Sequence, residues 1–266
     1  MLLVVAVEYF IIAILSLMDI VIFALAIKLK TFTELCKMPQ LRALLISEII
    51  AAFVHVFICI EWICFNLGIT ANVVSNTAHL HLISASGALV KIFYDSSTVV
   101  IFLQRIYFLC RPVLNARTSN KALLVLNCVL SLSVGLMYVV SPSTACHTVF
   151  LGSLVNYIIL SFSVTIILSG TVMVILIKRF WTSVSSHTER TINKFVSSFF
   201  YLRILCEFIP FIIGALMRAT IGRSLGTYVG AFGALGVALD TFVQSVVFSY
   251  MLRKSKQNVN QTHSTF

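Results

Sequence analysis

Ionisable side chains inside otherwise apolar stretches of this sequence are its first candidates for chemistry, and eight of them are singled out. They are Asp19, Glu48, Glu61, Lys91, Asp95, Arg203, Glu207 and Asp240. Charged groups are costly inside a membrane and therefore mark functional sites by default. Lys91 with Asp95, and Arg203 with Glu207, have the i, i+4 spacing that places opposite charges on one helix face. In each pair the two opposite charges therefore either neutralise each other or bind a ligand or ion inside a helix bundle.

Seven long apolar runs carry these side chains. They span approximately residues 4–27, 43–67, 82–110, 122–140, 153–177, 196–217 and 227–250. Each run supplies about 20 apolar residues, enough to cross about 30 Å of hydrocarbon as an α-helix. The runs lack the apolar/polar alternation of a membrane β-barrel. With 59% hydrophobic and 11% charged residues, the sequence predicts an all-α membrane protein, with a seven-transmembrane helix bundle in 1–252 and a short cytoplasmic tail in 253–266.

Lysine and arginine are distributed unevenly between the runs, and this distribution predicts the orientation. Of the 19 basic residues, 15 lie in alternate gaps and the tail, whereas only Arg218 and Arg223 lie in the opposite gaps. Short cytoplasmic loops collect Lys and Arg, so we expect the amino terminus outside and the carboxyl tail inside. The net charge of +10 fits loops that face anionic lipid, so membrane lipids rather than nucleic acid are the expected partners.

The most specific motif lies at the inner end of the third run, where residues 103–112 read LQRIYFLCRP. An arginine at the cytoplasmic end of the third of seven helices, followed seven residues later by proline, resembles the signature of rhodopsin-like G protein-coupled receptors. There an acid precedes the arginine and a tyrosine follows it, whereas Gln104 and Ile106 stand here. The resemblance assigns G protein coupling to Arg105, Tyr107 and Pro112, with Arg105 at the mouth of the cavity that receives the G protein. The alternative is a snorkelling arginine that faces lipid.

The sixth run keeps a second mark of that superfamily. Residues 206–210 read CEFIP, which retains the proline and the preceding aromatic residue of a Cys-Trp-x-Pro motif. Pro210 removes one i→i−4 hydrogen bond and is expected to kink the sixth helix. Small size, short tails and eroded motifs resemble the nematode serpentine chemoreceptors, among which class Srbc is our choice of subclass. The resemblance implies a plasma-membrane receptor, in sensory cilia, for a small-molecule odorant or pheromone-like ligand, which activates a heterotrimeric G protein.

The ligand of such a receptor would contact the outer halves of the third, fifth, sixth and seventh helices. The candidate ligand-binding residues are Lys91, Asp95, Asn156, Tyr157, Phe208, Phe211 and Tyr228. An anionic ligand would pair with Lys91. Cys64 and Cys146 both face the oxidising side, so a Cys64–Cys146 disulfide is a hypothesis that stands beside two free thiols.

Glycine is concentrated around the seventh run. Five of the eleven glycines lie at or within its start, namely Gly222, Gly226, Gly230, Gly233 and Gly236. Small residues let helices approach closely, so we expect helix packing rather than ligand binding to explain them.

A second interpretation is a small multi-pass transporter or channel, in which Asp95, Glu207 and Asp240 relay protons or ions. The chain lacks the inverted repeats and matching broken helices typical of transporters. An enzyme is not expected: residues 227–250 contain no lysine for a retinal Schiff base, and there is no His-rich box. We interpret the histidines at 79, 81 and 147 as solvated loop residues rather than a zinc site, so neither a metal nor another cofactor is expected.

Overall fold

Helices make up almost all of the structure, a computed structural model. It describes residues 2–28, 39–69, 77–110, 121–122, 124–129, 132–133, 145–180, 187–222 and 232–263. Within these ranges there is no β-strand, and six helices are long and apolar enough to cross a membrane. The predicted all-α class is therefore confirmed, and the apolar helices are typical of a multi-pass membrane protein.

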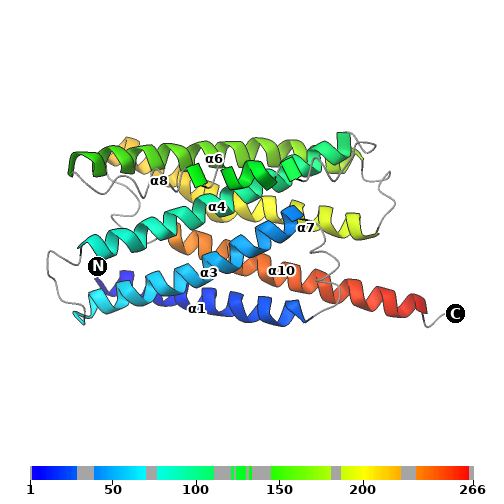
Figure 1. The fold of residues 1–266 in the computed structure, drawn as a ribbon, viewed down its shortest axis with the longest axis horizontal. Coiled ribbons are helices and arrows are strands. Elements are labelled where there is room, and N and C mark those ends of the chain that lie inside the picture. The colour runs from blue at the N-terminus through cyan, green and yellow to red at the C-terminus, as the bar shows by residue number, and fades with distance from the viewer. Residues whose placement is uncertain are drawn as a thin grey trace. The chain divides into compact units, whose positions relative to one another are not determined.

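The helices follow the predicted runs closely (Figure 1). In chain order they are α1 (Leu2–Ile27), α3 (Pro39–Asn66), α4 (Thr77–Cys110), α6 (Ala145–Arg179), α7 (His187–Arg203), the π-helix η2 (Ile204–Phe208), α8 (Ile209–Ile221) and α10 (Phe232–His263). Three elements cover the sixth run, namely α7, η2 and α8. They join without a break into one candidate span, Glu189–Ile221. The run at 122–140 lies largely outside the described residues, so the seventh span remains a prediction, as does the orientation of the termini.

Several helices extend beyond the apolar runs that predicted them. α6 contains 35 residues, and α10 continues to His263, so the predicted tail at 253–266 begins as an extension of the last helix. An α-helix satisfies its own backbone hydrogen bonds, and it therefore does not have to end where the hydrocarbon ends.

Two compact units form within the chain. Unit 1 comprises Met1–Leu35, Glu48–Ser84 and Tyr201–Phe266, and unit 2 comprises Cys36–Ser47 and Ala85–Phe200. In unit 1, α1 packs against α10, and Ile12, Cys59 and Ala238 form a buried apolar cluster. The rings of Tyr9 on α1 and Trp62 on α3 stack beside this cluster, with centroids 5.9 Å apart. The first and last helices of the chain therefore share one core.

Aromatic packing dominates the core of unit 2. Phe102 on α4 meets Phe199 and Phe200 on α7 in edge-to-face contacts, with ring centroids 5.8 Å and 6.0 Å apart. Such geometry places a positive ring edge on a negative ring face and is favourable. Gly170 on α6 lies against the same rings, because a Cβ atom there would overlap Phe200. Glycine is thus required at this position for α6 and α7 to pack.

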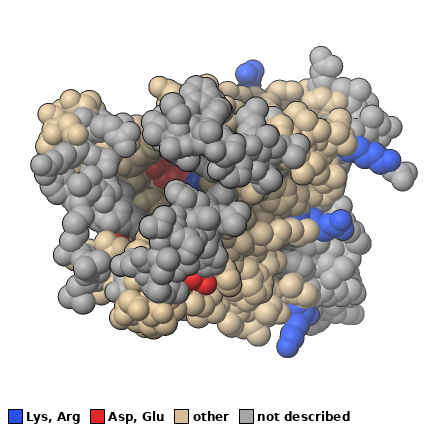
Figure 2. All heavy atoms as spheres, turned by 60° about the vertical axis from the view of Figure 1, so that its left-hand side comes forward, with Lys and Arg blue, Asp and Glu red and all other residues tan. Residues whose placement is uncertain are grey.

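Apolar side chains cover the outside of the helices. Phe10, Leu17 and Val21 on α1 are all more than half exposed. Figure 2 shows that the described surface in this view is largely uncharged. Apolar surface of this extent is unusual for a soluble monomer, whereas the hydrocarbon of a bilayer would cover it.

Candidate functional site

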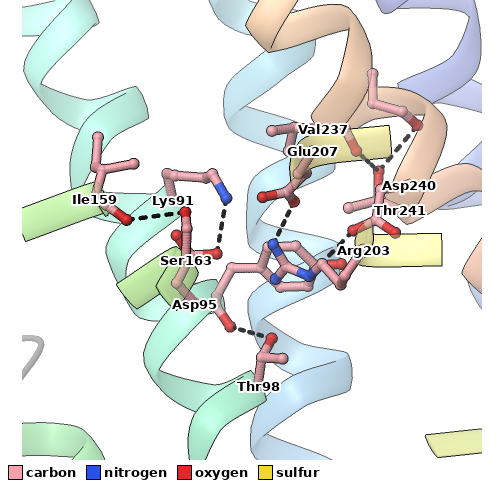
Figure 3. Close-up of polar contacts among 12 residues, drawn as sticks. Lys91, Asp95, Thr98, Ile159, Ser163, Arg203, Glu207, Val237, Asp240 and Thr241 are labelled. Carbon is pink, nitrogen blue, oxygen red and sulfur yellow. Dashed lines mark hydrogen bonds and ion pairs between the residues drawn. The ribbon is translucent and has the colours of Figure 1, made fainter. Parts of the chain in front are cut away.

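A buried arginine at the end of α7 is the centre of an ionic cluster in unit 1 (Figure 3). Arg203, the last residue of α7, is 2% exposed. Its Nη1 donates a hydrogen bond to Oε1 of Glu207, one helical turn later, and its Nε lies 3.3 Å from Oδ2 of Asp240 on α10. The predicted pairing of Arg203 with Glu207 is confirmed. Asp240 joins this pair from another helix, which sequence spacing did not indicate.

Two further carboxyl groups complete the cluster. Asp19 on α1 and Glu48 on α3 are both fully buried. The charges of Asp19, Asp240 and Arg203 all act on the carboxyl group of Glu48. Neither oxygen of Glu48 accepts a hydrogen bond from any residue that the structure describes. We call Asp19, Glu48, Arg203, Glu207 and Asp240 the carboxyl cluster.

One face of α10 provides the polar surroundings of the cluster. Thr241, Gln244 and Ser245 are all buried on this helix. Ser245 lies near the carboxyl group of Asp19. Its hydroxyl, however, donates a hydrogen bond to the Phe242 carbonyl at 2.9 Å. These residues and Asp240 recur at the three- to five-residue spacing of a single helix face. That periodicity is visible in the sequence, but a search limited to ionisable residues does not detect it.

A π-helical turn determines where Glu207 lies. In η2 the Ile209 N–H bonds to the Ile204 carbonyl, five residues earlier instead of four. Pro210 has no N–H to donate to the Cys206 carbonyl, four residues before it. That carbonyl oxygen lies against Gly236 of α10, where a Cβ atom would overlap it. The kink predicted at Pro210 thus falls beside a π-helical segment, a feature that is frequent at functional sites.

The second predicted ion pair lies on α4 in unit 2. Lys91 Nζ donates to Asp95 Oδ1 at 2.7 Å, which confirms the predicted pairing. The Lys91 side chain is 17% exposed and that of Asp95 only 1%. Lys91 is therefore the member of the pair that a ligand could reach.

Arg105 lies buried near the carboxyl-terminal end of α4, with 4% of its surface exposed. This burial disagrees with a snorkelling arginine that faces lipid. Glu189, in the first turn of α7, acts electrostatically on its guanidinium group. The preceding residue, Gln104, donates from Nε2 to Oε1 of Gln40 at 2.9 Å, and both amides are buried. The Gln40–Gln104 bond therefore joins the amino-terminal end of α3 to the carboxyl-terminal part of α4, next to Arg105.

Of the other two residues predicted for G protein coupling, Tyr107 and Pro112, the structure describes only the first. Tyr107 is half-buried on α4, and its ring lies 6.0 Å from that of Phe108. Pro112 lies outside the described residues.

The other residues predicted to contact the ligand are described only in part. Tyr157 on α6 and Phe211 on α8 are 67% and 40% exposed, and Phe208 is half-buried in η2. Tyr228 and the side chain of Asn156 lie outside what the structure describes. The ligand-binding set therefore remains a prediction.

The predicted disulfide also stays open. Cys64, near the end of α3, has a free thiol and is half-buried. The side chain of Cys146 lies outside the described residues, so the Cys64–Cys146 pairing remains a hypothesis.

Neutral polar residues were missed by sequence reasoning. Asn127, in the predicted fourth run, donates from Nδ2 to Ser97 Oγ at 2.9 Å and accepts a hydrogen bond from Ser96. This network joins the 124–129 segment to α4. A lone asparagine or glutamine in an apolar run is the signal that would have indicated it, because a buried amide requires partners.

No three His, Cys, Asp or Glu side chains within the described ranges are arranged to hold a metal ion. No protein-family model and no curated protein matches this chain. The buried charged groups and the helices that position them are therefore the basis for assigning a function.

Proposed function

We propose that this protein is a G protein-coupled chemosensory receptor of the plasma membrane, which binds a small external chemical and activates a heterotrimeric G protein. The observation that carries the proposal is the burial of Arg105 beside Glu189. An arginine is almost never fully buried unless it is paired or functional. Here Arg105 lies near the end of a membrane helix. A cytoplasmic partner could reach it once the amino-terminal end of α7 moves away.

Activation requires a helix that moves. Glu189 lies in the first turn of α7, and the same continuous helix contains η2 and Pro210 further along. Displacement of the α7 amino-terminal end would separate Glu189 from Arg105 and expose the guanidinium group. A ligand that contacts Lys91 drives this change only by the difference between its affinities for the two conformations.

Substitution of Arg105 tests the proposal. In cells that co-express a promiscuous Gα subunit, Arg105→Ala is expected to reduce ligand-evoked calcium signals by about tenfold or more, within the range of typical allosteric coupling. Surface expression should be retained. Arg42→Ala, which removes an exposed arginine near the start of α3, is the matched control and should signal like the wild type.

Glu189→Gln provides the complementary measurement. Loss of its charge should raise basal signalling about two- to fivefold, the range expected for a partly exposed charge interaction. Unchanged signalling in both Arg105→Ala and Glu189→Gln would refute the assignment of Arg105.

A second candidate function, a transporter or channel, is favoured by the fully buried carboxyl groups of Asp19, Glu48 and Asp240. Intramembrane acids of this kind occur in proton and ion pathways. Ligand-evoked current in oocytes without an added G protein, lost in Asp240→Asn and retained in Arg105→Ala, would favour this function over the receptor.

A further inference from the structure

The carboxyl cluster contains more acid than base. The cluster has four carboxyl groups, from α1, α3, η2 and α10, and one guanidinium, that of Arg203. Arg203 forms ion pairs with both Glu207 and Asp240 but carries only one positive charge. Asp19, Glu48 and Asp240 are fully buried. An uncompensated ionised carboxylate in such a place costs several kcal/mol, so the excess negative charge has to be neutralised.

Glu48 is the group with the least compensation. It is fully buried, and neither oxygen accepts a hydrogen bond from the described residues. The charged groups that face it are Asp19 from α1, Asp240 from α10 and Arg203 from α7. Two of these three are acids. On the η2 side, Glu207 and Cys206 face Arg203 and Asp240.

We propose that the carboxyl cluster is an internal proton-binding site, in which Glu48 carries the proton at neutral pH and Asp19 is the acid beside it. A protonated carboxyl is neutral and has an O–H donor, whereas an ionised carboxylate only accepts hydrogen bonds. A proton on Glu48 therefore removes one buried charge and supplies a donor directed into a group of acceptors. The proposal does not depend on whether the protein is a receptor or a transporter.

A proton suits this site better than a metal ion. Metal cations are held in proteins by several oxygen ligands that converge on one point. Among the residues that the structure describes, no three acidic, His or Cys side chains are placed in that way. A proton needs only one carboxyl group and one nearby acceptor.

Release of the proton would be coupled to the packing of η2 on α10. These elements contact each other where the Cys206 carbonyl lies against Gly236, within one turn of both Glu207 and Asp240. Separation of η2 from α10 would admit water, which solvates the ionised Glu48 carboxylate and takes up its proton. The closed arrangement thus binds one more proton than the open one, and rising pH favours the open one.

Infrared spectroscopy of the full chain in lipid nanodiscs tests the site directly. The C=O stretch of a protonated carboxyl is separate from the bands of a carboxylate and shifts in D₂O. We expect this band in the wild type at neutral pH, and we expect Glu48→Gln to reduce it. Glu61→Gln, which removes a half-buried carboxyl group on the same helix, is the matched control and should leave the band unchanged.

Two further measurements make the result decisive. Asp19→Asn leaves Glu48 in place but removes its neighbour, so the band should persist at a shifted frequency. Glutamine mimics a protonated glutamate, so Glu48→Gln should fold as the wild type does. No band in the wild type, a band that survives unchanged in Glu48→Gln, an unshifted band in Asp19→Asn, or unfolding of Glu48→Gln would each overturn the proposal. Loss of the wild-type band when sodium replaces choline would identify a metal cation as the occupant instead.

Discussion

At the scale of single residues, Arg203 belongs to a buried group of charges. Such a group adds little net stability, but the loss of any one member destabilises the fold. Its guanidinium lies between Glu207, on the same continuous helix, and Asp240, on another helix. Desolvation offsets most of the attraction within such a pair. Removal of one partner, however, leaves the others charged and buried. The three side chains must therefore be altered together to keep the core intact.

Arg203→Leu is accordingly expected to destabilise the protein by about 3–5 kcal/mol, the cost of leaving a buried charge without its partner. Thermal unfolding in detergent micelles measures this loss. The triple variant Arg203→Leu, Glu207→Gln, Asp240→Asn should recover most of it, because no member of the group then remains charged.

Arg179→Leu serves as the control, since this arginine is exposed at the end of α6. An Arg203→Leu variant as stable as Arg179→Leu would contradict the ionic role assigned to Arg203.

Sequence spacing predicted the two ion pairs on single helices because i, i+4 neighbours on a helix meet whatever the tertiary fold. It could not predict that Asp240 joins Arg203, or that Glu189 acts on Arg105, because those contacts depend on how separate helices pack. The Gln40–Gln104 bond was missed for the same reason.

At the scale of the elements, the candidate span formed by α7, η2 and α8 is an α-helix interrupted by one π-helical segment. η2 lies directly before Pro210, and its Cys206 carbonyl packs on a glycine of α10. The concentration of glycine around the seventh run predicted close packing, and the structure identifies Gly236 as a residue that permits it. Gly233, one turn earlier, has open space around it.

These two glycines provide a matched pair of substitutions. Gly236→Ala is expected to destabilise the protein by about 1–3 kcal/mol, because the added methyl group forces η2 and α10 apart. Gly233→Ala should instead stabilise α10 by up to about 1 kcal/mol, the difference in helix propensity. Thermal unfolding of both variants side by side is the measurement. Equal effects of the two substitutions would show that η2 and α10 are not in close contact.

At the scale of the whole molecule, the apolar runs located the helices because the length needed to cross hydrocarbon is set by the bilayer. The run at 4–27 agrees with the candidate span Val4–Ile27. The extensions of α6 and α10 beyond their apolar runs could not be located in this way, since hydropathy indicates the apolar part of a helix and not the residue at which the helix ends. The apolar run at 196–217 likewise gave no sign of the π-helix within it.

Glycosylation mapping tests the predicted topology. Acceptor sequons inserted at the amino terminus and at residues 70–76 should be glycosylated, whereas a sequon inserted at residues 181–186 should not, because lysine and arginine retain the flanking loops on the cytoplasmic side. Glycosylation at 181–186, or both termini on one face of the membrane, would exclude the seven-span arrangement.

The packing of α1 against α10 also has a consequence for biosynthesis. Asp19 leaves the ribosome long before Asp240 and Ser245 are translated. Unit 1 therefore cannot close cotranslationally, and the earliest helix must wait in the translocon or the bilayer with its acidic group unshielded. A chain that stalls before α10 retains that acid in lipid, where the quality-control factors of the membrane can distinguish it from a finished molecule.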